Sequence, residues 1–131
     1  MKHKSLELLL AKVADQLSCR VELIPHINNM SEIILWADLA ITGAGTTLYE
    51  VLYLGTPALI CVLEDNQVPS ASEVFKLQMG LFLDINSFDC FSKTFRLILE
   101  SYPTRMALVE NQNKYFQDVG ITKDILYEIF N

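Results

Sequence analysis

The chain has 131 residues, of which 51% are hydrophobic and 20% are charged. This length and composition fit one packed domain and exclude an intrinsically disordered chain. The net charge of -6 argues against nucleic acid as a partner, because phosphate backbones attract clustered Lys and Arg, and the ten basic residues here are scattered.

The cysteines and the hydropathy bear on the compartment. Cys19, Cys61 and Cys90 form no CxxC pair, which fits a reducing cytoplasm better than a disulfide framework. No apolar run approaches the ~18 residues of a membrane span, and no signal peptide opens the sequence. We therefore expect a cytoplasmic protein without a transmembrane segment.

Hydrophobic periodicity and turn residues predict an alternation of helices and strands. The expected elements, in chain order, are a helix over 4–18, a strand over 20–24, helices over 30–37 and 47–54, strands over 39–42 and 58–63, a helix from Ser70 closed by Gly80, a strand over 81–83, and helices over 88–101, 104–117 and 121–130. This order predicts an α/β fold: a Rossmann-like open parallel sheet of about four strands, flanked by helices and ending in a helical C-terminus. We expect residues 1–131 to form a single domain.

The loops after the strands are where ligands bind in such a sheet. The turn Gly43-Ala44-Gly45-Thr46 leads directly into a helix, whose free N–H groups and positive dipole end favour an anion such as phosphate. The glycines permit a sharp turn and a close approach of the ligand. The alternative is a strand-to-helix turn that needs its glycines for geometry alone.

Two further polar features have two interpretations each. Glu50 follows Thr47 by three residues, so it completes a capping box, or it accepts hydrogen bonds from a vicinal diol such as a ribose. Asn66 and Gln67 lie in a polar cluster after the strand over 58–63. Their amides suit sugar hydroxyls and phosphate oxygens, or they belong to a solvated loop. His26 has no partner at metal-ligand spacing, and nothing in the sequence requires a metal or another cofactor.

An ordered series of motifs carries a family resemblance over about residues 4–84. The series is Ile27-Asn28-Asn29-Met30, Trp36-Ala37-Asp38-Leu39-Ala40-Ile41, Gly43-Ala44-Gly45-Thr46-Thr47-x-x-Glu50, Leu54-Gly55-Thr56-Pro57-Ala58 and Asp65-Asn66-Gln67. Together these motifs resemble the C-terminal lobe of GT-B glycosyltransferases. Within that group they are most similar to PseG- and SpsG-like UDP-sugar hydrolases, and then to MurG-like N-acetylglucosaminyltransferases.

The resemblance implies a UDP-sugar site in an enzyme of surface polysaccharide biosynthesis. By position, the backbone amide of Ile27 meets the uracil edge, and the amides of Gly45, Thr46 and Thr47 hold the diphosphate. Glu50 corresponds to the carboxylate that binds the ribose diol. The side chains of Gln67 and Asn66 correspond to amides near the phosphate and the sugar.

The sequence also departs from the resemblance. The N-terminal lobe of the family, which supplies the catalytic histidine in the hydrolases, has no counterpart here, and His26 lies in the wrong loop to replace it. Alone, the chain is expected to bind nucleotide sugar without catalysis. Two strands that lie between the counterparts of 20–24 and 38–42 in the family are also missing. We therefore expect a homodimer, an N-terminal lobe as partner, or direct pairing of 20–24 with 38–42. The alternative function is a non-catalytic interaction or regulatory half of a split glycosyltransferase.

Overall fold

The structure is a computed structural model that describes residues 2–22, 24 and 26–118. The elements in this part of the chain are, in order, α1 (Lys2–Gln16), α2 (Met30–Trp36), β1 (Ala40–Gly43), α3 (Thr46–Leu54), β2 (Ala58–Cys61), the 3-10 helix η1 (Asp65–Gln67), α4 (Val68–Lys76), β3 (Leu81–Phe82), α5 (Phe88–Glu100) and α6 (Tyr102–Asp118). The expected helix over 121–130 lies outside the described residues.

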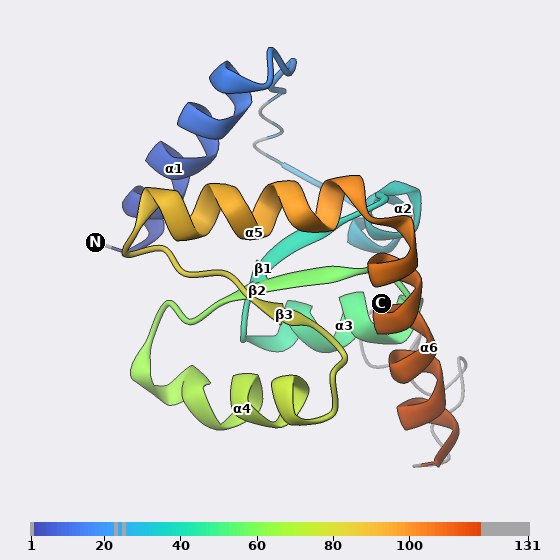
Figure 1. Ribbon diagram of the computed structural model, residues 1–131. Helices are drawn as coiled ribbons and strands as arrows, with labels where there is room; N and C mark the ends of the chain where they lie inside the picture. Colours follow the sequence, from blue (N-terminus) through green and yellow to red (C-terminus); the bar gives the residue numbers. More distant parts are fainter. Residues whose placement is uncertain (1, 23, 25, 119–131) are drawn as a thin grey trace.

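The described strands form one parallel sheet in the order β1-β2-β3. Ala40 pairs with Ala58, and Leu59 pairs with Leu81, so neighbouring strands start at nearly the same level. Helices α1 and α5 cover one face of this sheet, and α3 and α4 cover the other (Figure 1). This arrangement confirms the predicted α/β class and the Rossmann-like parallel sheet flanked by helices.

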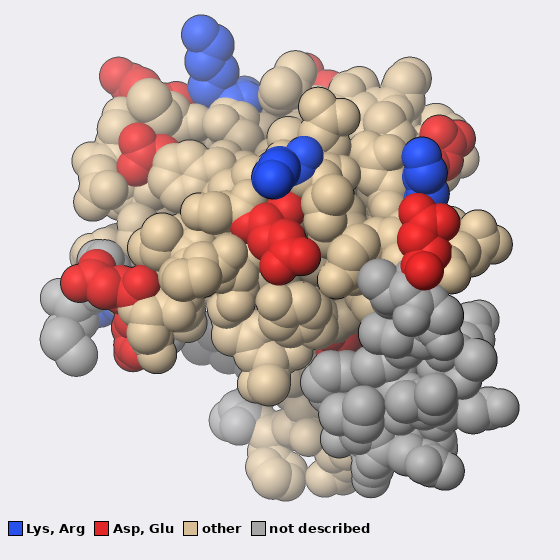
Figure 2. Space-filling model, turned by 90° about the horizontal axis from the view of Figure 1, so that it is seen from below, with Lys and Arg blue, Asp and Glu red and all other residues tan. Residues whose placement is uncertain are grey.

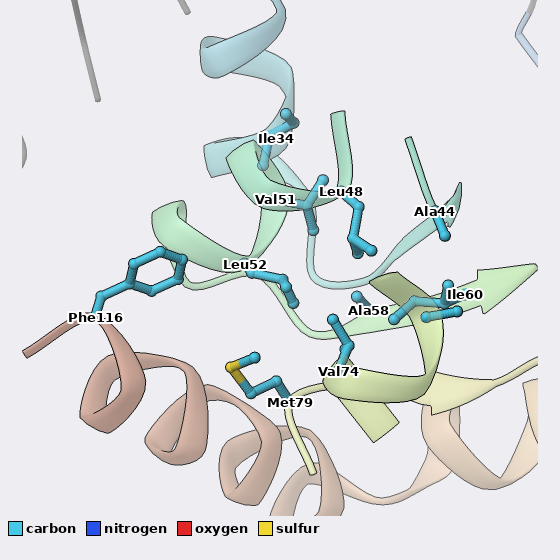
Figure 3. Packing of buried hydrophobic residues seen from close by; sticks show 11 residues of the cluster. Ile34, Ala44, Leu48, Val51, Leu52, Ala58, Ile60, Val74, Met79 and Phe116 are labelled. Carbon is cyan, nitrogen blue, oxygen red and sulfur yellow. The ribbon is translucent and has the colours of Figure 1, made fainter. Parts of the chain in front are cut away.

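The apolar residues of β2 divide the core between the two faces. Ala58 and Ile60 join a cluster with residues of α2, α3, α4 and α6, whereas Leu59 and Cys61 join a second cluster under α1 and α5. All four side chains are fully buried, as expected for a central strand covered on both faces. Figure 3 shows how α3 contributes to the first cluster, whose labelled members are Ile34, Ala44, Leu48, Val51, Leu52, Ala58, Ile60, Val74, Met79 and Phe116.

Side chains of α6 fasten the end of the sheet where the strands begin. The Gln112 side chain is fully buried, and its Nε2 donates to the carbonyl oxygens of Thr56 and Met79, each at 3.0 Å. Asn111 Nδ2 donates to the carbonyl oxygen of Gln78 at 2.9 Å. The residues bonded here precede β2 and β3, so one helix ties together the entries to both strands. Figure 1 shows α6 at this end of the sheet.

One predicted strand is not formed. Residues 20–22 and 24 have no strand conformation, and β1 pairs only with β2 in the part of the chain that the structure describes. The sheet therefore has three described strands where about four were expected, and the expected pairing of 20–24 with 38–42 is absent from these residues. A short strand needs a hydrogen-bonded neighbour. Without one, Val21 and Ile24 remain 63% and 49% exposed.

The residues at the helix ends account for the observed bounds of α2, α3 and α4. Helix α3 ends at Leu54, the predicted bound, and Gly55 follows with a left-handed φ of 82° and an N–H that donates to Leu52 O. Asn29 caps α2, because its side chain accepts from the Glu32 N–H. Helix α4 instead ends at Lys76, before Gly80. A Cβ on Gly80 would lie 2.5 Å from Ile60 Cδ1, so this glycine serves the close approach of β3 to β2 and not the end of the helix.

Candidate functional site

The candidate site begins at the carboxyl end of β1, where the chain turns directly into α3. Gly45 is the N-cap of this nine-residue helix, and no side chain caps it. Ala44 is buried in the core, whereas Gly45, Thr46 and Thr47 are exposed. The turn is therefore anchored on its inner side and open on its outer side. The carboxyl ends of β1 and β2 both lie at the end of the sheet away from α6 (Figure 1).

The first backbone N–H groups of α3 are available to a ligand. In the described part of the chain, the N–H groups of Gly45, Thr46 and Thr47 donate to no protein acceptor, whereas the next one, of Leu48, donates to Gly45 O at 3.2 Å. Free donors at the start of a helix, aligned with its dipole, bind anions. The turn thus offers three consecutive amide donors for phosphate oxygens.

Different physical reasons account for the glycine at each of the two positions of the turn. A Cβ on Gly43 would lie 3.0 Å from Leu63 Cδ1, so packing inside the protein accounts for this glycine. A Cβ on Gly45 would meet only Gln67 Nε2, at 3.8 Å, and its φ of -92° is open to any residue. Internal packing therefore explains Gly43 and leaves Gly45 without an internal reason. An exposed glycine in this place lets another molecule approach the backbone closely.

Gln67 joins the turn to the loop that follows β2. Its side-chain Oε1 accepts the N–H groups of Leu63 at 3.0 Å and of Ala44 at 3.4 Å. Because both partners are donors, the oxygen of the amide must face them. The Nε2 group then lies on the Gly45 side of the turn, as the 3.8 Å distance to the position of a Gly45 Cβ indicates. Gln67 thus fixes the turn with one end and presents N–H donors beside it with the other.

Glu50 lies one helical turn after the free amides, and only 9% of it is exposed. Its Oε1 accepts a hydrogen bond of 2.7 Å from the hydroxyl of Ser31 on α2. The predicted capping box of Thr47 with Glu50 is wrong, because α3 begins at Thr46 with Gly45 as N-cap. No local pattern pointed to Ser31, because it lies 19 residues away on a separate helix.

The remaining predicted residues lie in the two adjoining loops. Ile27 is half-buried and precedes α2 by three residues, and the neighbouring His26 is exposed. Asn66 is exposed in η1, next to Gln67. The described hydrogen bonds join Ala44 of the turn with Gln67, and Glu50 with Ser31. They do not join Ile27 or Asn66 to the other predicted residues.

Charge contributes little on the face that α3 and α4 cover. Figure 2 shows this face with its coloured Lys and Arg side chains standing apart, and with Asp and Glu among them. An anion on this side would depend on backbone amides and on neutral side chains. Within residues 2–22, 24 and 26–118, no group of three or more His, Cys, Asp or Glu side chains is placed to hold a metal ion. Among the same residues, no helix is both long enough and apolar enough to cross a bilayer.

The buried thiol of Cys61 in β2 lies outside the candidate anion site. Burial raises the pKa of Cys61 to about 11, so its reactive thiolate form is suppressed near neutral pH. Cys61 packs against the α1 and α5 side of the sheet, which agrees with a structural core residue.

The sheet is parallel, has helices on both faces, and has free backbone donors beyond the carboxyl end of a strand. These features define a Rossmann-like nucleotide-binding type of domain. Comparison with protein families makes this specific. Residues 3–125 match the glycosyltransferase family 28 C-terminal domain, and the chain belongs to this family. The family confirms the predicted C-terminal lobe of GT-B glycosyltransferases. Comparisons with curated proteins and with solved structures gave no match.

Proposed function

We propose that this domain binds the nucleotide diphosphate of a UDP-sugar at the turn between β1 and α3. The observation that carries the proposal is the set of exposed residues Gly45, Thr46 and Thr47 at the start of α3, whose amides donate to no acceptor in the described part of the chain. Membership in the glycosyltransferase family makes a nucleotide sugar the appropriate ligand. The Nε2 group of Gln67 adds a donor beside the same turn. Uracil as the base, and its contact with Ile27, rest on the resemblance alone.

The proposed reaction of the complete enzyme is hydrolysis or transfer at the sugar–phosphate bond, as in PseG- or SpsG-like enzymes of polysaccharide biosynthesis. The role of this domain is to stabilise the departing diphosphate. Backbone donors that already point at the ligand stabilise developing negative charge without reorganisation. The catalytic groups then come from an N-terminal lobe. By itself, the domain is proposed to bind the ligand and to turn over no substrate.

The test is a titration of UDP, uridine and pyrophosphate into the isotope-labelled protein, followed by the backbone amide signals. UDP and pyrophosphate are expected to shift the signals of Gly45 to Thr47, because both carry the diphosphate. Uridine is expected to leave these three signals in place, since it lacks phosphate. Unchanged signals of Gly45 to Thr47 at millimolar UDP would contradict the proposal.

A second candidate function has an observation of its own. Trp36 is 84% exposed and Leu35 61% exposed on α2, and β1 has no described neighbour on its outer side. Exposed aromatic residues beside an open strand edge favour association with another chain. This supports the interaction half of a split glycosyltransferase, or a homodimer. Sedimentation of the purified protein, alone and with a co-expressed catalytic lobe, tests it: a monomer that does not bind the lobe excludes both.

A further inference from the structure

The hydrogen bond between Ser31 and Glu50 connects α2 to α3 at the proposed site. The Ser31 hydroxyl donates to Glu50 Oε1 at 2.7 Å, and Glu50 as a residue is 9% exposed. An acidic side chain that is this deeply buried needs hydrogen-bond partners. Ser31 therefore satisfies one oxygen of the carboxylate and fixes the direction in which the other oxygen points.

In the part of the chain that the structure describes, the second oxygen of Glu50 has no donor. No described group donates to Oε2, and among the described residues the only fully buried side-chain oxygen without a partner is Oε1 of Gln112. Among the described residues nothing donates to Oε2, which leaves this oxygen available to a hydroxyl of a ligand. Side chains of a helix lean toward its N-terminus, so the Glu50 carboxylate is displaced toward the free amides of the turn.

We infer that Ser31 is a positioning residue, which holds Glu50 so that Oε2 accepts a hydroxyl group of the ligand. The inference rests on the proposed function. It assigns the ligand hydroxyl to the ribose, because a ribose lies about one helical turn from a diphosphate bound at the start of α3. With Oε1 occupied by Ser31, a single oxygen serves the ligand. Selection of a ribonucleotide over a deoxyribonucleotide thus depends on the Ser31 hydroxyl as well as on the carboxylate.

Two physical effects follow from this arrangement. A carboxylate held in place loses less side-chain freedom on binding, which corresponds to about a three- to tenfold gain in affinity. A buried acceptor that is built to meet a hydroxyl also rejects the analogue that lacks it, since the acceptor is then left unpaired. Loss of the Ser31 hydroxyl weakens both effects together.

The experiment compares UDP with 2′-deoxy-UDP by calorimetry, using wild type, Ser31→Ala, Ser31→Thr, Glu50→Gln and the double variant. Ser31→Ala is expected to weaken UDP binding about three- to tenfold and to reduce the preference for UDP over 2′-deoxy-UDP. Ser31→Thr keeps a hydroxyl and is expected to restore both. In the Glu50→Gln background, Ser31→Ala is expected to change UDP binding little, because Ser31 acts through the carboxylate.

Thr56→Val is the matched control. The Thr56 hydroxyl donates to Ile34 O on α2 at 2.8 Å, so this substitution also loosens α2 but leaves Glu50 untouched. It is expected to lower the melting temperature without changing the preference for UDP. A Ser31→Ala variant that keeps wild-type affinity and preference overturns the inference and leaves the proposed function intact. A Thr56→Val variant that loses the preference to the same extent also overturns it. Wild-type protein that binds neither nucleotide overturns both.

Discussion

Substitutions of Gln67 separate its structural role from its proposed role in binding. Its Oε1 accepts two backbone N–H groups, and its Nε2 lies beside Gly45. In Gln67→Glu, a carboxylate oxygen can still accept both N–H groups, but a negative charge replaces the Nε2 donors. In Gln67→Leu, both acceptor contacts are lost at nearly constant volume. Gln67→Leu is therefore expected to lower stability, whereas Gln67→Glu is expected to weaken binding at nearly unchanged stability.

The expected magnitudes follow from the contacts. Each backbone hydrogen bond contributes about 0.5–1.5 kcal/mol, so Gln67→Leu lowers the free energy of unfolding by about 1–3 kcal/mol. Gln67→Glu keeps these bonds and stays close to wild type. Two like charges about 4 Å apart repel by about 1 kcal/mol in water and about 4 kcal/mol near a protein surface. Gln67→Glu therefore weakens UDP binding from about fivefold to several hundredfold.

Urea unfolding measures the first quantity, and calorimetry with UDP measures the second. Calorimetry at two salt concentrations provides an internal control, because added salt screens the repulsion and recovers part of the affinity of Gln67→Glu. Wild-type affinity in Gln67→Glu would refute the placement of Nε2 beside the diphosphate. Wild-type stability in Gln67→Leu would refute the structural role of the Oε1 bonds.

Three further predictions use other positions of the sheet and the turn. Gly45→Ala is expected to keep wild-type stability and to weaken UDP binding. Gly43→Ala is expected to lower the free energy of unfolding by about 1 kcal/mol in urea, because its Cβ is crowded. A loss of stability in Gly45→Ala and none in Gly43→Ala would contradict the roles assigned to the two glycines. Gln112→Leu leaves two buried carbonyl groups without donors and is expected to lower the free energy of unfolding by about 2 kcal/mol or more, so an unchanged midpoint would exclude its role between the strands. At pH 8, a thiol reagent is expected to label the two exposed cysteines of the native protein and not Cys61. Folding raises the pKa of Cys61 from 9.0 to about 11, so the thiol of the unfolded chain loses its proton at lower pH than that of the folded protein. The stabilisation from Cys61 is therefore complete below pH 9 and is lost as the pH rises toward 11. Urea unfolding at pH 8 and pH 10, compared with Cys61→Ala, which lacks the thiol, checks this pH dependence.

The sequence predicted those parts of the fold that depend on local patterns. The apolar run of β2 and the left-handed Gly55 appear where expected, because burial on both faces and a helix C-cap each have a local signature. The predicted strand over 20–24 is not formed in the described residues 20–22 and 24, since strand pairing depends on a neighbour that local sequence cannot supply. Helix α3 starts one residue earlier than predicted, because its N-cap is a glycine whose backbone needs no side-chain partner.

The candidate site was predictable only in part, for a similar reason. The turn from Gly43 to Thr47 was found because glycines and hydroxyl residues between a strand and a helix are a local signal. The contacts of Gln67 with Ala44 and of Ser31 with Glu50 cross 23 and 19 residues of sequence. Each depends on how two elements pack, and no periodicity encodes them. Gly45 and Gly43 look alike in sequence, and only the space around each backbone separates them.

The two hydrogen bonds from Gln112 to the start of the strands imply that backbone amide hydrogens exchange with solvent at different rates at the two ends of the sheet. At the α6 end, backbone carbonyls are paired with buried amides, so opening there requires α6 to separate from the sheet. At the other end, the first amides of α3 donate to no acceptor among the described residues, so they have no hydrogen bond to break. Their hydrogens therefore exchange with deuterium within the open native structure, without any unfolding. A bound diphosphate would turn these fast-exchanging positions into protected ones, and the rest of the domain would keep its exchange pattern.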